Sequence, residues 1–299
     1  MTDLATSVDV QTSRAMLRHM LVARGVDAEA VRLQNQGRVD LWLSCRGQEA
    51  AQVASAMAIG EATTIFPSYR EHAVAIVRGI DGVGLVAQWA GKTFCGWNPH
   101  RHRFFPYTLV VAAQTLHAVG FAIARRLQSL SEMVVVYLGD GATSEGDVSE
   151  AMNLAAVEQV PVLFVVQNNG WAISKPSHEQ MRTSIAERAR GFGITSWSVP
   201  TEDPELAYLH CVGAREHVET TGTPGLIELR TTRTAGHSSS DAHTLYRDEH
   251  ELAAAAANDP VQRYRDRLLS AGVVDDLWLA EIDRDIEAHS RAMVEAFGR

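Results

Sequence analysis

The stretch Leu138–Ser174, LGDGATSEGDVSEAMNLAAVEQVPVLFVVQNNGWAIS, decides the fold. It continues a short apolar run, Met133–Leu138, which is typical of a buried strand and stops at Gly139-Asp140-Gly141. A helical pattern follows, and Pro161 separates it from a second apolar run, Val162–Val166. Strand, helix and strand in this order form a βαβ unit, so we expect two parallel strands that end at the same edge of a sheet.

Two features predict the helix of this unit. Ser144 and Asp147 stand at the spacing of a capping box. The apolar residues that follow recur every three or four positions, as one face of a helix requires: Val148, Ala151, Met152 and Ala155. We therefore expect the helix to begin near Ser144 and to pack on the sheet.

Asp140 and Asn169 come directly after the two expected strands, so they should be neighbours in space. Carboxylate and amide oxygens suit Mg²⁺ or Ca²⁺, and Mg²⁺ leaves coordination positions for phosphate oxygens. The adjacent glycines permit close approach of the backbone, and the following helix start offers free N–H groups to a phosphate. Either motif alone is more often an ordinary turn. Together, at both exits of one βαβ unit, they favour a metal–diphosphate site.

The pattern GDG followed by NN resembles the thiamine diphosphate signature. The longer text GDGATSEGD…NNGWAIS resembles the alpha subunit of the decarboxylating component of branched-chain 2-oxoacid dehydrogenase, close to pyruvate dehydrogenase alpha subunits. The similarity runs from about Met16 to the C-terminal helices. It implies an α/β fold, namely the diphosphate-binding half of a thiamine diphosphate enzyme, with a parallel sheet and helices on both faces. It also implies oxidative decarboxylation of a branched-chain 2-oxo acid with acyl transfer to a lipoyl carrier.

The resemblance further implies the site residues. Tyr69-Arg70 matches the step that holds the cofactor diphosphate, and arginine suits this because its planar fork makes paired bonds to phosphate oxygens. His237 aligns with a histidine that reaches the active site from a loop, although a lone loop histidine usually faces solvent. The other implied cofactor contacts are Leu109, Val111, Gly141, Ala142 and Gln167, and the implied Mg²⁺ ligands are Asp140, Asn169 and the backbone oxygen of Trp171.

Several positions depart from the family pattern. Leu109 replaces a serine that contacts the cofactor, Gln167 stands where branched-chain relatives often have an arginine, and Gly236 stands where a second histidine often occurs. Only Thr108 and Gln114 keep oxygen ligands in a segment that usually binds potassium, so we do not predict a potassium site. These departures leave open an alternative, a pathway-specific carboligase or acyl-loading enzyme on the same heteromeric scaffold.

The remaining elements are predicted from apolar spacing and from Gly and Pro. The expected strands are Thr63–Phe66, Thr108–Ala112, Ile194–Val199 and Leu226–Leu229. The expected helices are Ser13–Val31 with a break at Gly25, Ala50–Ile59, one from Gln114 with Leu116, Val119, Gly120, Ile123 and Leu127 on one face, Pro204–Glu219, one from Asp259-Pro260, and a final helix through Ile282 and Met293. Thr231–Arg247 should be a long exposed loop.

Composition restricts the class of protein. The chain has 299 residues, a net charge of −9 and no dense Lys/Arg run, which argues against nucleic acid as a partner. Three widely spaced cysteines form neither a disulfide framework nor a zinc motif, and they fit reduced thiols in a cytoplasm. We see no signal peptide and no apolar stretch that would span a membrane. A nucleotide-binding dehydrogenase is disfavoured because no G-x-G-x-x-G follows a first strand.

We expect residues 1–12 to be a flexible N-terminus and residues 13–299 to form one domain with C-terminal helices. The resemblance implies half an active site, because a beta subunit of the transketolase-like type holds the rest of the cofactor in an α₂β₂ heterotetramer. A lipoyl acyltransferase component is a further candidate partner. Ser238 and Ser240 stand where mitochondrial relatives are phosphorylated, but the sequence shows no kinase. The identity of the 2-oxo acid is not predicted.

Overall fold

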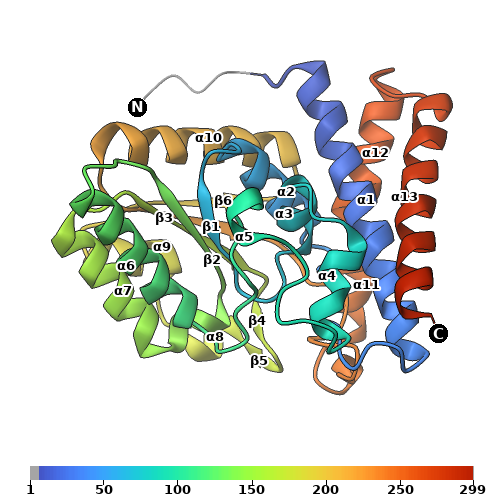
Figure 1. The fold of residues 1–299 in the computed structure, drawn as a ribbon, viewed down its shortest axis with the longest axis horizontal. Helices are drawn as coiled ribbons and strands as arrows, with labels where there is room; N and C mark the ends of the chain where they lie inside the picture. The colour runs from blue at the N-terminus through green and yellow to red at the C-terminus, as the bar shows by residue number, and fades with distance from the viewer. Residues whose placement is uncertain (1–6, 299) are drawn as a thin grey trace.

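A five-stranded parallel sheet lies at the centre of the computed structural model, which describes residues 7–298 (Figure 1). Its strand order is β1-β2-β3-β7-β6. The strands are β1 (Thr64–Phe66), β2 (Val134–Gly139), β3 (Val162–Asn168), β6 (Thr195–Pro200) and β7 (Gly225–Arg230). A separate antiparallel pair joins β4 (Trp171–Ala172) to β5 (Lys175–Pro176). The predicted βαβ unit is confirmed, since β2 and β3 are parallel neighbours.

Helices cover both faces of the sheet (Figure 1). One face carries α6 (Ala113–Leu127), α7 (Gly146–Glu158) and α9 (Ile185–Gly191). The other carries α2 (Glu49–Ala58), α3 (His72–Val77) and α10 (Pro204–Thr221), and beyond them α1 (Val10–Asn35), α4 (Gly82–Trp89), α12 (Pro260–Ser270) and α13 (Asp276–Phe297). Short helices in the connections are α5 (Pro99–His102), η1 (Gly141–Ser144), α8 (Ser177–Gln180), η2 (His243–Leu245) and α11 (Glu249–Ala257).

The central strands are buried on both sides. Val134, Val136 and Leu138 of β2 pack toward α6 and α7, whereas Val135 and Tyr137 belong to the core on the opposite face. Burial of both faces explains why these strands read as continuous apolar runs in the sequence. Each buried valine or leucine stabilises the fold by about 1.5–3 kcal/mol. The predicted fold class, a parallel sheet with helices on both faces, is confirmed.

Helix α1 differs from its prediction at two points. It begins at Val10, before Ser13, because the Asp9 side chain caps it by accepting a hydrogen bond from the Thr12 N–H at 2.9 Å. The predicted break at Gly25 is wrong, because the helix continues through it. A Cβ at Gly25 would lie 2.4 Å from Ile286, so this glycine permits α13 to pack closely on α1. Residues 1–6 of the predicted flexible segment lie outside the described residues.

The predicted strand Thr108–Ala112 is wrong. The segment forms a loop in which Leu109, Val110 and Val111 are 54%, 72% and 41% exposed. It ends at Ala112, whose φ of 74° is left-handed and turns the chain into α6. An apolar run indicates burial only on average, and here the apolar side chains lie at the surface.

The predicted face of α6 is confirmed in part, since Val119 is buried and Leu116 and Ile123 pack against the core on this side of the sheet. The buried residues of the helix are Gln114, Thr115, Ala118, Val119 and Ala122. Gly120 is exposed and Leu127 is 78% exposed, so these two members of the predicted stripe do not face the sheet.

The predicted capping box at Ser144 is wrong as well. The Asp140 carbonyl accepts hydrogen bonds from the Thr143 N–H and hydroxyl, which closes a 3₁₀ turn first. Helix α7 then begins at Gly146 with Glu145 as its N-cap and without a side-chain capping bond. Asp147 still lies in the first turn, where its charge complements the helix dipole.

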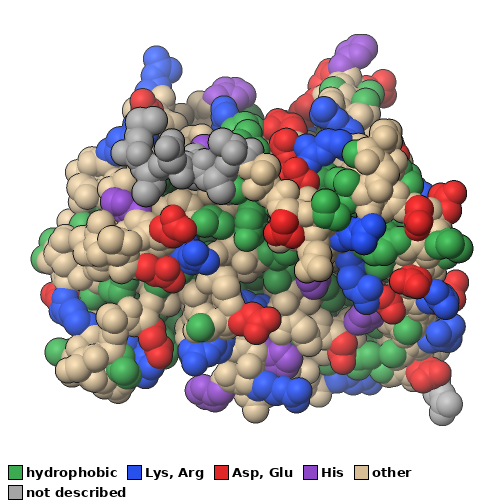
Figure 2. All heavy atoms as spheres, turned by 90° about the horizontal axis from the view of Figure 1, so that it is seen from above, with side chains coloured by type: hydrophobic (Ala, Val, Ile, Leu, Met, Phe, Trp, Pro, Cys, Tyr) green, Lys and Arg blue, Asp and Glu red, His purple; other side chains and the backbone are tan. Residues whose placement is uncertain are grey.

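The C-terminal helices begin as predicted. Asp203 and Asp259 cap α10 and α12, and each helix has proline in its first turn. None of the helices within residues 7–298 is long and apolar enough to cross a membrane. Lys/Arg and Asp/Glu side chains are interspersed over the surface seen from above (Figure 2).

The C-terminus of α7 provides a test of backbone strain. Gln159 is exposed and has φ 50° and ψ 57°, the left-handed conformation that favours glycine. We expect Gln159→Gly to raise the free energy of unfolding by about 0.5–1 kcal/mol, measured by thermal or denaturant unfolding. The matched control is Gln128→Gly at the end of α6, where φ is −86° and glycine should destabilise. Equal effects in both variants would contradict the assignment of strain.

Candidate functional site

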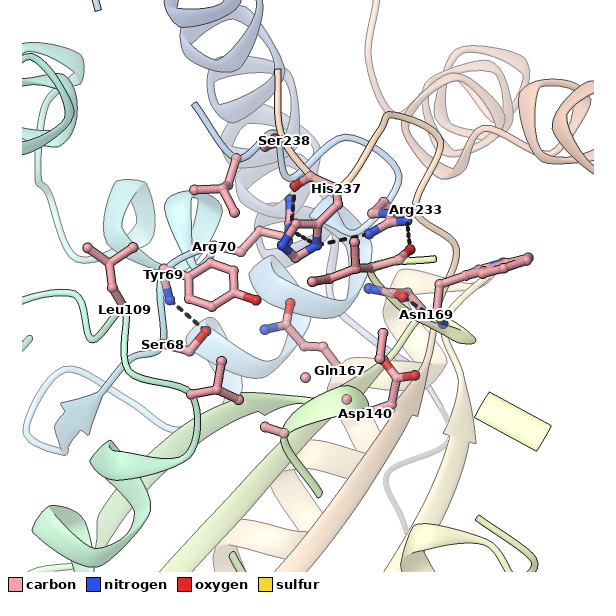
Figure 3. Close-up of a pocket in the computed structure, with 18 of the residues that line it drawn as sticks. Ser68, Tyr69, Arg70, Leu109, Asp140, Gln167, Asn169, Arg233, His237 and Ser238 are labelled. Atoms are coloured by element: carbon pink, nitrogen blue, oxygen red, sulfur yellow. Dashed lines mark hydrogen bonds between the residues drawn. The ribbon is translucent and has the colours of Figure 1, made fainter. Parts of the chain in front are cut away.

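A cavity of about 570 Å³ opens at the carboxyl edge of the sheet. Gly139 in β2 pairs with Gln167 in β3, which pairs with Leu229 in β7, so the next residues of all three strands leave the same edge. This is the edge at which open parallel sheets usually bind ligands. Every residue implied by the resemblance lines the cavity: Tyr69, Arg70, Leu109, Val111, Asp140, Gly141, Ala142, Gln167, Asn169, Trp171 and His237. Figure 3 labels seven of them, Tyr69, Arg70, Leu109, Asp140, Gln167, Asn169 and His237.

Asp140 forms the deep, acidic part of the cavity. Its side chain is 1% exposed, and Ser177 Oγ donates a hydrogen bond to its Oδ2 at 2.5 Å. Burial raises the pKa of the Asp140 carboxyl, although the hydrogen bond from Ser177 acts in the opposite direction. In the part of the chain that the structure describes, no salt bridge compensates this carboxylate. A bound cation would therefore stabilise its charged form.

Asn169 and Trp171 lie beside Asp140 on the turn that follows β3. Asn169 Oδ1 accepts a hydrogen bond from the Trp171 N–H at 3.1 Å, and Asn169 Nδ2 donates to Gln48 Oε1 at 3.3 Å. The Trp171 indole donates to Glu251 at 3.0 Å, so its ring is held by the C-terminal segment.

This donor set fits Mg²⁺. It offers a carboxylate, an amide oxygen and a backbone oxygen, and Mg²⁺ commonly takes its other ligands from phosphate and water. No group of three or more His, Cys, Asp or Glu side chains suited to a metal occurs in residues 7–298. A phosphate ligand would complete the coordination of a metal held by this donor set.

Two buried guanidinium groups face the same cavity. Arg70 is 6% exposed and donates to the backbone oxygens of Ser44 at 2.7 Å and His237 at 2.8 Å. Arg233 is 1% exposed and donates to the Ile173 carbonyl at 3.0 Å. Burial lowers the pKa of Arg233, and the nearby Arg70 acts in the same direction. Neither arginine forms an ion pair among the described residues, so the site favours an anionic ligand.

His237 lies between these two arginines (Figure 3). Its Nδ1 is 3.3 Å from Arg70 and 3.2 Å from Arg233, and since guanidinium groups only donate, Nδ1 must accept and Nε2 carries the proton. Burial, Arg70 and Arg233 together lower the pKa of His237 to about 4. The imidazole is therefore neutral at neutral pH and can donate a hydrogen bond through Nε2.

The loop Thr231–Arg247 is not exposed throughout, contrary to its prediction. Arg233 and Arg247 are buried, and Arg247 donates to the Arg233 carbonyl at 2.6 Å. The Asp241 carboxylate accepts hydrogen bonds from the His237 N–H and the Tyr246 hydroxyl. These contacts hold His237 at a fixed position, which an unsupported polar loop would not do.

Sequence reasoning missed several residues of the site. Arg233 follows β7 at the same edge as Asp140 and Asn169, so the carboxyl-edge argument that found those two residues would also have found it. Gln48 Nε2 and Gln114 Oε1 line the cavity, are buried, and have no hydrogen-bond partner among the described residues. Such a donor and acceptor are costly to bury unless a ligand or water satisfies them. No local pattern marks these glutamines.

Both polar and apolar side chains line the cavity. Asp140, Asn169 and the arginines are polar, whereas Leu41, Leu43 and Leu109 are apolar. A hydrogen bond joins two segments that line the cavity: the Ser68 carbonyl accepts from the Thr108 N–H at 3.0 Å. The cavity can therefore hold an anion that also has an apolar part.

A cavity at the carboxyl edge of a parallel sheet, beside a helix start and lined by buried arginines, is typical of α/β proteins that bind phosphorylated ligands. The profile of one family, described as "Dehydrogenase E1 component", matches residues 17–297. The chain belongs to this dehydrogenase E1 component family.

Three relatives illustrate the range of similarity. The chain is 39% identical to the 3-methyl-2-oxobutanoate dehydrogenase subunit alpha of Mycobacterium tuberculosis, over 94% of this chain and 76% of that protein. It is 33% identical to the 2-oxoisovalerate dehydrogenase subunit alpha of Bacillus subtilis, over 87% and 83%. It is 30% identical to the pyruvate dehydrogenase E1 component subunit alpha of Bacillus cereus, over 91% and 73%.

Proposed function

We propose that this chain is the alpha subunit of a thiamine diphosphate-dependent dehydrogenase that oxidatively decarboxylates a branched-chain 2-oxo acid and passes the acyl group to a lipoyl carrier. The observation that carries the proposal is the convergence of Asp140, Asn169, Arg70 and His237 on one cavity at the carboxyl edge. Relatives named for branched-chain 2-oxo acids reach 39% identity, above the 30% of a relative named for pyruvate, which supports the substrate class.

In this proposal Asp140, Asn169 and the Trp171 backbone oxygen hold Mg²⁺. Thiamine diphosphate supplies the ring that accepts electrons when carbon dioxide leaves. Tyr69, Arg70 and the backbone around Gly141 and Ala142 bind its diphosphate. A Cβ at Gly141 would lie 2.6 Å from that of Ala172, so glycine permits these two segments of the cavity wall to pack closely.

His237 has a distinct role. Because it is neutral and protonated at Nε2, it donates a hydrogen bond to an oxygen of the substrate and is positioned to move a proton there. Arg233 fixes its orientation by donating to Nδ1. The apolar side chains of Leu41, Leu43 and Leu109 then lie where they can contact the aliphatic part of a branched substrate.

A beta subunit completes the site in this proposal, in an α₂β₂ assembly that acts in the cytoplasm with a lipoyl acyltransferase component. Leu109, Val110 and Val111 form an exposed apolar loop at the rim of the cavity. Phe94, in a neighbouring segment, is 79% exposed. Exposed apolar clusters of this kind mark protein interfaces. We also propose that residues 13–299 form a single domain.

The test is turnover with and without the beta subunit. We expect the purified chain alone to release no carbon dioxide from 3-methyl-2-oxobutanoate, and the co-expressed complex to do so with thiamine diphosphate and Mg²⁺, because half of the cofactor site belongs to the partner. Pyruvate serves as the control substrate and should react more slowly. Turnover by the isolated chain would refute the half-site, and accumulation of a carboligation product would favour the alternative indicated by Leu109, Gln167 and Gly236.

A further inference from the structure

A second buried carboxylate, Glu71, lies in the wall of the cavity next to Arg70. It is 1% exposed. Gln167 Nε2 donates to its Oε1 at 2.6 Å, and the Arg70 backbone N–H approaches its Oε2 at 3.3 Å. Within the described residues, neither oxygen forms an ion pair. Glu71 thus has hydrogen bonds but no positive charge in direct contact.

The orientation of Gln167 is fixed by a chain of amides. Gln52 Nε2 donates to Gln167 Oε1 at 2.8 Å, and Gln52 Oε1 accepts from the Ala73 N–H at 2.9 Å. The NH₂ group of Gln167 must therefore face Glu71. A neutral amide occupies the position from which a cationic side chain would have compensated the carboxylate.

The charge of Arg70 partly opposes the effect of burial on the pKa of Glu71. Burial raises the pKa of the Glu71 carboxyl, opposed by the hydrogen bonds from Arg70 N–H and Gln167 and by the charge of Arg70. The Arg70 guanidinium itself donates to Ser44 and His237. Among the described residues, the other titratable groups around Glu71 or across the cavity are Tyr69, His72, Tyr107, Tyr137, Asp140, Glu145, Arg233 and His237.

We propose that Glu71 binds the cofactor diphosphate as a neutral acid: it takes up a proton from solvent as the diphosphate enters, and its protonated Oε2 donates a hydrogen bond to a phosphate oxygen. This inference rests on the proposed function. An anion placed beside a buried, uncompensated carboxylate adds like-charge repulsion to desolvation, and both effects favour protonation. A protonated carboxyl gains the donor that a carboxylate lacks, so the repulsion is replaced by a hydrogen bond.

The sign of the pH dependence follows from this linkage. Binding raises the pKa of Glu71, so the wild-type complex binds one more proton than the free enzyme between the free and bound pKa values. Cofactor affinity must then fall as pH rises through that window. Replacement by glutamine, which is permanently neutral and can donate through its NH₂ group, should remove this part of the pH dependence.

The experiment is isothermal titration calorimetry of the assembled enzyme with thiamine diphosphate and Mg²⁺, in paired buffers of different ionisation enthalpy from about pH 6.5 to about pH 9. We expect the proton uptake of wild type to exceed that of Glu71→Gln by up to about one proton per site. Subtracting the uptake of the variant from that of wild type removes the protons that the cofactor itself exchanges. Gln167→Arg should also lower the uptake, because a cation beside Glu71 keeps it ionised.

Glu145→Gln is the matched control, since Glu145 lines the same cavity but is exposed, and it should keep the wild-type uptake. Equal proton counts in wild type and Glu71→Gln across the pH range would overturn the proposal. If Glu71→Gln does not assemble, unchanged uptake in Gln167→Arg overturns it. Failure of wild type to bind the cofactor at all would instead contradict the proposed function.

Discussion

Asp140→Asn should abolish the Mg²⁺-dependent stabilisation of the cofactor complex. The carboxylate is the only charged member of the proposed donor set, and an amide replaces it without a change of shape. At roughly a hundredfold excess over its Kd, a ligand stabilises the folded state by about 2.7 kcal/mol, and the variant should lose nearly all of this. The measurement is thermal unfolding of the assembled enzyme, titrated with Mg²⁺ at saturating thiamine diphosphate.

The unfolding temperature of the metal-free protein shows whether the substitution removes metal binding or disrupts the fold. Burial raises the pKa of Asp140 in the folded state, so the free energy of unfolding falls as pH rises through that pKa. Ionised Asp140 therefore destabilises the metal-free protein at neutral pH. The metal-free variant should therefore unfold at the same temperature as wild type or higher. Asp147→Asn, an exposed change just beyond the same turn, should keep the Mg²⁺ response. An unchanged Mg²⁺ titration in Asp140→Asn would remove Asp140 from the metal site.

The residues of the site that can be predicted from the sequence are those that directly follow the parallel strands. Asp140 and Asn169 follow two apolar strands separated by one helix, and parallel pairing alone brings them to one edge. The position of Arg70 and His237 was not determined in this way. It came from resemblance, because a residue in a loop reaches the cavity only through contacts made by distant segments, such as Arg70 with His237.

The unpredicted part depends on tertiary contacts between residues far apart in sequence. Glu71 and Arg233 are charged residues that a sequence reading places at the surface, yet both are buried against the cavity. For the segment after Tyr107, the sequence predicts burial and the structure shows exposure. Its apolar residues read as a buried strand, but Leu109 and Val110 are exposed at or beside the cavity rim. Hydrophobic pattern predicts burial within one chain and cannot distinguish a core from a surface reserved for another subunit.

His237→Asn should reduce turnover of the complex by about 10²–10⁴-fold, the usual contribution of a positioned proton-transfer group. Asparagine Oδ1 can still accept from Arg70 and Arg233, so the loop should remain folded. Cofactor affinity should change little, because in the proposed site Asp140, Asn169 and Arg70 hold the diphosphate and metal. His243→Asn, in the same loop but outside the cavity, is the matched control and should keep near-normal turnover.

The pH dependence distinguishes the chemical role of His237 from a structural one. The pKa of His237 in the folded protein, about 4, lies below the ordinary histidine value of 6.5, so between these values the unfolded chain binds a proton that the folded site excludes. Wild-type stability should therefore fall as pH drops from about 6.5 toward 4, and His237→Asn should lose less stability over that interval. Above this window both proteins should be equally stable while turnover still differs. A variant that loses cofactor binding and stability together at neutral pH would make His237 a structural residue of the loop.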